Sequence, residues 1–124
     1  MATQYPKPNV LSALCSSRIV LNHITSRWAV LVFVVLRNET LRFSQVRRQI
    51  DGVSERMLSQ TLKTLENDGF VVRLSYDVVP PHVEYHLTPM GCDMADRLLD
   101  MVRFIEGNLT NIMRAQTPIL QSAL

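Results

Sequence analysis

The sequence is poor in cysteine and contains no long apolar run. Its 124 residues include only two cysteines, Cys15 and Cys92, too few for a disulfide scaffold, so we expect free thiols in a reducing compartment. The most apolar run, residues 28–36, has nine residues, whereas a membrane-spanning helix needs about 20. The N-terminal residues lack the apolar core of a secretory signal. We therefore expect a cytoplasmic protein.

Motifs that carry catalysis or bind metals are also missing. The sequence has no glycine-rich phosphate loop, no nucleophile elbow and no paired carboxylates in a catalytic arrangement. His82 and His86 lie four residues apart and would share one strand face, but no nearby cysteine or carboxylate completes a metal-binding pattern. We therefore expect neither an enzyme nor a protein that holds a metal or cofactor.

The composition predicts one folded domain with an uneven charge distribution. Apolar residues make up 47% of the chain, enough for a single core. Residues 1–75 carry ten Lys/Arg and five Asp/Glu, a net charge of +5, whereas residues 76–124 carry three and six, a net charge of −3. This asymmetry indicates a polyanionic partner for the basic part, although a chance distribution over a solvated surface would give the same numbers.

Apolar periodicity and capping residues predict five helices and three short strands. The expected helices cover residues 16–24, 26–37, 44–50, 55–68 and 90–116. The expected strands cover residues 41–43, 71–75 and 83–87. The helix over 26–37 is apolar nearly all round, which places it at the centre of the core. Its valines would also suit a strand, but its length favours a helix.

The helices over 44–50 and 55–68 are joined by a short turn that contains Gly52, as in a helix-turn-helix. Ser44 and Ser54 are expected to cap their N-termini, and Gly69 to end the second helix in a left-handed conformation. The two strands that follow are joined by a loop with two prolines, which suits a wing. The expected fold class is α+β, mainly α: a winged helix-turn-helix with a long C-terminal dimerisation helix.

The second helix of such a pair enters the major groove of DNA. Its outward face is rich in Ser, Arg and Gln instead of the Glu/Lys ladder of inert surfaces. Arg56 can bind guanine and Gln60 adenine, whereas Lys63 suits a phosphate. The predicted DNA contacts are Arg42, Ser44, Arg47, Arg48, Ser54, Glu55, Arg56, Ser59, Gln60, Lys63, Arg73 and His82. The alternative is an ordinary solvated surface.

Apolar residues continue along the predicted last helix at steps of 4, 3, 4, 4 and 3. This seam consists of Met94, Leu98, Met101, Ile105, Leu109 and Ile112. A helix of about 25 residues is about 38 Å long, more than the core of one small domain covers. We therefore expect the seam to bind a second copy of the chain, although the helix could instead fold back on its own core.

The pattern resembles the HxlR family of bacterial winged-helix transcriptional regulators, relatives of the MarR group. The matching segments are Cys15, TSRW at 25–28, LRFSQVRRQIDGVSERMLSQTLKTLENDGFVVR at 41–73 and VVPPHVEYHLTPMG at 78–91. The family's usual Cys-Pro is Cys15-Ser16 here. The resemblance covers residues 15–113, the HxlR-type domain, and leaves residues 114–124 as a C-terminal tail. Residues 1–14, with Pro6, Pro8 and scattered polar groups, are expected to form a flexible N-terminal arm.

The resemblance implies a homodimer that binds operator DNA and a dimer interface formed by the first and last helices, which adds Ile19 to the seam. The interpretation is a sequence-specific transcriptional regulator, a homodimeric repressor with a palindromic operator. Some family members sense electrophiles or oxidants through a cysteine at the position of Cys15, so Cys15 is the candidate redox sensor; the alternative is a buried, inert thiol. A different class also remains open, a winged-helix module that binds protein without binding DNA.

Overall fold

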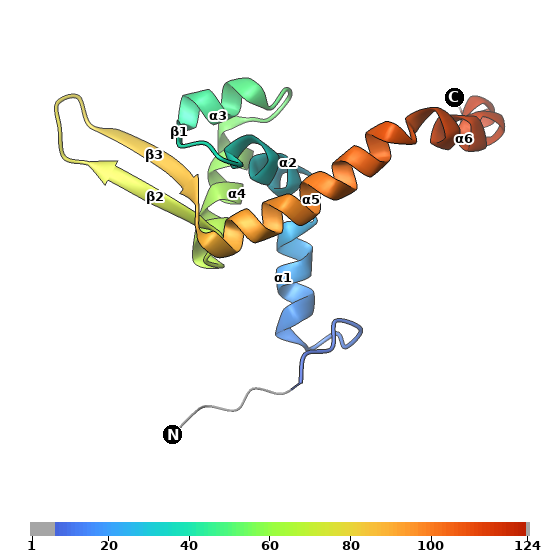
Figure 1. Ribbon diagram of the computed structural model, residues 1–124, viewed down its shortest axis with the longest axis horizontal. Helices are drawn as coiled ribbons and strands as arrows, with labels where there is room; N and C mark the ends of the chain where they lie inside the picture. The colour runs from blue at the N-terminus through green and yellow to red at the C-terminus, as the bar shows by residue number, and fades with distance from the viewer. Residues whose placement is uncertain (1–6, 124) are drawn as a thin grey trace.

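Six helices and a three-stranded sheet form the part of the chain described by the computed structural model, which covers the backbone of residues 7–123 and the side chains of residues 7–116 (Figure 1). The helices are α1 (Ser16–Ile24), α2 (Arg27–Leu36), α3 (Phe43–Gln49), α4 (Glu55–Asn67), α5 (Pro89–Gly107) and α6 (Leu109–Ala123). The strands are β1 (Leu41–Arg42), β2 (Val71–Tyr76) and β3 (His82–Leu87). The predicted winged helix-turn-helix of class α+β is confirmed.

The core is built around α2, which packs against α4 and α5. Val32 and Phe33 of α2 are completely buried, and the Phe33 ring meets that of Phe70 edge-on at 5.5 Å. Leu58, Leu62 and Leu65, which recur along one face of α4, are likewise buried. The segment over residues 26–37, for which a helix was favoured over a strand, forms the helix α2, so that prediction is confirmed.

The sheet is antiparallel, with strand order β1-β3-β2. β2 and β3 form a hairpin in which Val71 pairs with Leu87 and Tyr76 with His82. We call this hairpin and its loop, residues 77–81, the wing; it extends away from the helices (Figure 1). β1 adds the pair Leu41–Tyr85, so the helix-turn-helix is attached directly to the wing.

Local capping agrees with most of the predicted helix ends. The Ser54 hydroxyl accepts a hydrogen bond from the Met57 N–H at 3.1 Å, and Gly69 has a φ of +85°, the left-handed conformation that favours glycine. The predicted start of the third helix was wrong. α3 begins at Phe43, so Ser44 lies inside its first turn, because the Gln45 side chain already accepts a hydrogen bond from the Arg42 N–H at 2.8 Å.

The expected single last helix is divided into α5 and α6 at Asn108. The Asn108 side chain donates a hydrogen bond to the Phe104 carbonyl at 2.8 Å and its backbone N–H donates to the same oxygen at 3.0 Å. Glycine and asparagine are weak helix formers, so Gly107-Asn108 is a natural break. α6 continues to Ala123, so residues 114–123 of the expected tail are helical, and Leu124 lies outside the described residues.

The apolar seam is divided as well. Leu98 is buried and Met94 packs against the same core, so these two residues belong to the interior of the single chain. Cys92, near the start of α5, is exposed. Within residues 7–123, no single helix is long and apolar enough to cross a membrane. Only α1 and α2 taken together have that length and hydropathy, and a bend of 68° separates them.

Candidate nucleic-acid interface

The first nine residues of α4, from Glu55 to Lys63, present an exposed polar face. Arg56, Ser59, Gln60 and Lys63 lie on the side opposite the buried leucines, and all four are exposed. The spacing of three and four residues that keeps the leucines inward places these side chains together outward. The face therefore offers two cations, an amide and a hydroxyl, the groups that can hydrogen-bond to base edges and phosphates.

The turn of the helix-turn-helix forms a charged hollow of about 410 Å³. Two arginines, Arg47 and Arg48, and two carboxylates, Asp51 and Glu55, line it together with Ser44 and the turn backbone. The Arg47 guanidinium spans the turn, with 3.4 Å contacts to the Val53 carbonyl and to the Glu55 carboxylate. Arg48 is exposed and forms no ion pair within the described part of the chain. Arg47 therefore supports the turn, whereas Arg48 is the freer cation.

A second hollow, of about 310 Å³, separates α4 from the wing. Lys63 of α4 and Arg73 of β2 both line it, so two predicted phosphate contacts from distant parts of the sequence share one groove. Glu66 of α4 and Tyr85 of β3 also line it; neither was among the predicted contacts, because only the folded hairpin brings β3 beside this part of α4. The Glu66 carboxylate lowers the positive charge of this groove.

The end of the wing next to its loop holds His82 in a cluster. The imidazole stacks on the Tyr76 ring with 4.6 Å between the centroids, and its Nε2 lies 3.7 Å from a Glu84 carboxylate oxygen. The hydrogen bond of the Tyr76 hydroxyl to the Glu84 carboxylate, and the negative charge of that group, raise the pKa of Tyr76. His82, partly buried in this cluster, is thus less available to DNA than Arg42 or Arg73, both of which are exposed.

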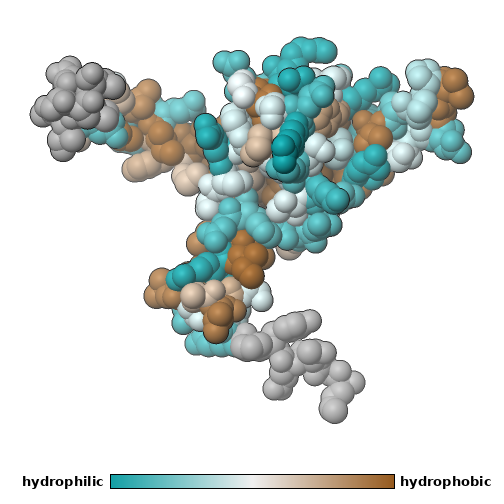
Figure 2. Space-filling model, turned by 180° about the vertical axis from the view of Figure 1, so that it is seen from behind, coloured by the Kyte–Doolittle hydropathy of each residue, from teal (hydrophilic) through white to brown (hydrophobic). Residues whose placement is uncertain are grey.

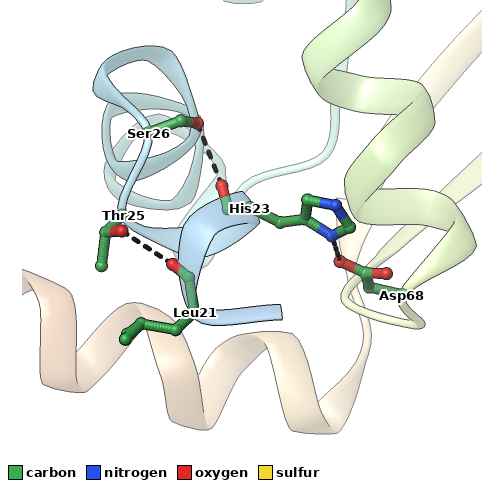
Figure 3. A network of polar contacts seen from close by, with 5 residues as sticks. All are labelled: Leu21, His23, Thr25, Ser26 and Asp68. Atoms are coloured by element: carbon green, nitrogen blue, oxygen red, sulfur yellow. Dashed lines mark hydrogen bonds and ion pairs between the residues drawn. The ribbon is translucent and has the colours of Figure 1, made fainter. Parts of the chain in front are cut away.

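A polar contact that the sequence did not reveal connects α1 to the end of α4 (Figure 3). The His23 Nδ1 lies 2.7 Å from the Asp68 carboxylate, which accepts the hydrogen bond. In the same corner, the Thr25 hydroxyl donates to the Leu21 carbonyl and the Ser26 hydroxyl donates to the His23 carbonyl. A shift of α1 would therefore act on the C-terminal end of α4.

Cys15 is partly buried at the N-terminal end of α1. The Asn9 N–H donates to its sulfur at 3.3 Å, and the Ser17 hydroxyl lies 3.0 Å from it. These hydrogen bonds lower the pKa of the Cys15 thiol. Arg18 lies one turn further along α1, but its guanidinium donates to the carbonyls of Val10 and Leu11 and not to the sulfur. A hollow of about 550 Å³ opens beside the sulfur.

Apolar side chains are exposed along α1, α5 and α6. Figure 2 shows brown, hydrophobic atoms on the projecting arm formed by α5 and α6. Of the predicted interface residues, the exposed ones are Ile19, Met101, Ile105 and Leu109, and Ile112 is partly buried. Phe104, which the seam did not include, is 67% exposed. Its position one turn from Asn108 places it beside the break between the two helices.

The fold, the exposed polar face of α4 and the arginines and lysine beside it define a winged helix-turn-helix DNA-binding protein. The chain belongs to the HxlR-like helix-turn-helix family, whose model matches residues 23–113. It is 49% identical to YtfH of Escherichia coli strain K12, an uncharacterized HTH-type transcriptional regulator, over 91% of this chain and 90% of that protein. The family thus consists of transcriptional regulators and not of enzymes.

Two solved structures extend the comparison. The structure of ytfH from Salmonella typhimurium is 50% identical, with a TM-score of 0.85 over 90% of this chain and 99% of that chain. The redox regulator HypR in its reduced form is 33% identical, with a TM-score of 0.71 over 78% of this chain and 96% of that one. The similarity therefore covers both the helix-turn-helix and most of the flanking helices.

Proposed function

We propose that the protein is a homodimeric repressor that binds a palindromic operator through α4. The observation that carries this proposal is the exposed polar face of α4, which lies between the arginine-containing hollow at the turn and the hollow lined by Lys63 and Arg73. A repressor needs no further activity, because a dimer seated on operator DNA excludes other proteins from the same site. A promoter fused to a reporter should become more active when the gene is deleted; lower activity would indicate an activator.

Arg56 and Gln60 are assigned to base reading, and Ser54, Glu55 and Ser59 border them on the same helix end. Ser44, Lys63, Arg42, Arg47, Arg48, Arg73 and His82 are assigned to the DNA backbone. Arg56→Ala should cost about 1–3 kcal/mol at the selected site and relax its sequence preference, because it removes a bidentate contact to guanine.

Selection from a random pool of duplex DNA, followed by binding titrations, measures both effects. Lys63→Ala is the matched control, since it removes one positive charge from the same helix and should weaken all sequences alike. An unchanged preference in the Arg56 variant would contradict base reading. No binding of the parent at low salt would favour a protein-interaction module, because DNA binding strengthens steeply as salt falls.

The proposed dimer uses the exposed apolar side chains of α1, α5 and α6, namely Ile19, Met101, Ile105 and Leu109, with Ile112 at the edge. Such side chains are costly to leave in water, which favours a partner surface. A two-fold dimer would place the reading helices about 34 Å apart, one turn of DNA. Sedimentation should therefore give twice the mass of 14.2 kDa, and selected sites should be palindromic.

We also propose that Cys15 responds to oxidants or electrophiles. The hydrogen bonds that lower the pKa of its thiol, and the hollow beside it, favour a reactive thiolate over an inert one. HypR, a redox regulator, supports this only by similarity. The Cys15→Ser protein should bind DNA as tightly as the parent, and peroxide or diamide treatment should no longer change its affinity for DNA. An equal response of both proteins to the treatment would contradict a sensing role for Cys15.

A further inference from the structure

Arg27, the first residue of α2, lies beside the exposed polar face of α4, although it precedes the helix-turn-helix in the sequence. Its neighbour Ser26 lines a hollow of about 180 Å³ together with Met57 and Gln60 of α4. On its other side, the Trp28 ring reaches within 3.9 Å of the Cβ position of Gly52, in the turn. Arg27 is thus flanked by the N-terminal half of α4 and by the turn of the helix-turn-helix.

The guanidinium of Arg27 is held in place but not neutralised. Its central carbon lies 4.9 Å from the centre of the Trp28 ring, a cation–π contact. Arg27 is exposed, and within the described part of the chain no carboxylate lies at ion-pair distance from it. By contrast, Arg37 at the other end of α2 forms an ion pair with Asp96 at 2.7 Å.

A cation that is already oriented loses less conformational freedom when it binds an anion. Arginine also matches the geometry of a phosphate with two parallel donors. We infer that Arg27 contacts a phosphate of the DNA backbone next to the turn, with Trp28 as the platform that positions it. This inference rests on the proposed DNA binding, and it adds a contact from outside the helix-turn-helix that fixes how α4 sits in the groove.

The test compares Arg27→Gln, Arg27→Lys and Arg37→Gln with the parent by fluorescence anisotropy, on a selected site and on unrelated duplex DNA, from low to high salt. Arg27→Gln should weaken binding to both DNAs roughly 5–10-fold at low salt and reduce the slope of log affinity against log salt by about one per bound chain. Arg27→Lys should keep most of the slope, because the charge remains. Arg37→Gln changes the net charge equally and should leave the slope unchanged.

The outcomes separate the inference from the proposed function. If the parent binds DNA and Arg27→Gln keeps its affinity and slope, the phosphate contact is wrong. Equal losses in the Arg27→Gln and Arg37→Gln proteins would also overturn it, because they would reflect net charge alone. If the parent binds no duplex at low salt, the proposed function itself fails. Thermal unfolding of each variant checks that the exposed substitution at Arg27 leaves the fold intact.

Discussion

Replacing Gly91 with alanine tests how closely the start of α5 packs against Phe70 and Leu87, next to the sheet. A Cβ at Gly91 would lie 2.1 Å from the Phe70 carbonyl oxygen and 3.2 Å from the Leu87 Cβ. The Phe70 carbonyl also accepts the Thr88 N–H at 3.0 Å, in the link that leads from β3 into α5. The carbonyl cannot withdraw without disturbing that hydrogen bond, so α5 itself must move away from the sheet.

The size of the effect follows from these distances. Ordinary contacts begin at 3.4 Å, so the two backbones must separate by about 1 Å. Overpacking costs about 1–3 kcal/mol, and we expect about 3 kcal/mol here because backbone atoms, unlike the end of a flexible side chain, cannot turn aside. For a domain of this size, that loss corresponds to a decrease of about 10–15 °C in the unfolding temperature.

Circular dichroism at a fixed protein concentration measures this change, since association would make the midpoint depend on concentration. Gly107→Ala is the matched control in the same helix, because a Cβ there meets no atom within 4 Å. Alanine is the better helix former, so the control should unfold at the parent temperature or slightly above it. A Gly91→Ala protein as stable as the parent would refute the close packing of α5 against the Phe70 carbonyl.

Two further predictions concern the ends of α1. His23→Ala removes the 2.7 Å hydrogen bond between His23 and Asp68, whose side chains are 35% and 16% exposed. This substitution should lower the free energy of unfolding by about 1 kcal/mol. Additive losses in a double-mutant cycle with Asp68→Ala would show that the two residues are not coupled. Ser17→Ala removes a hydrogen bond to sulfur, so the pKa of Cys15 should rise and alkylation by iodoacetamide at neutral pH should slow. An unchanged pH profile of alkylation would contradict that cause.

Local signals in the sequence were sufficient for the helix-turn-helix. Ser54 and Gly69 act through their own backbone surroundings, so their capping roles could be inferred without knowledge of distant residues. The break at Asn108 was missed because apolar spacing continues across it, and spacing does not report a single residue that bonds back to the preceding turn. The burial of Leu98 was missed for a related reason, since periodicity identifies an apolar side but not what covers it.

The surroundings of the candidate interface depended on contacts between distant elements. His23 and Asp68 are 45 residues apart, and nothing in either local pattern connects them. The Tyr76–His82 stack arises only from the register of the wing, which the loop prolines alone do not specify. Sequence reasoning therefore identified which side chains face outward on α4, but not which of them are supported, neutralised or left free by their neighbours.

The way in which α5 leaves the core makes it a lever. Gly91, Ala95 and Leu98 anchor its first half, whereas residues from Met101 onward project beyond the domain (Figure 1). The nine residues of α5 after Leu98 extend about 14 Å, so a tilt of about 10° at Leu98 moves the end of α5 by about 2.4 Å. In a dimer joined near that end, this displacement would be about two thirds of the roughly 3.4 Å rise of one base pair. In such a dimer, a change in core packing around Leu98 would shift the two DNA-binding halves relative to each other by a distance that matters for DNA register.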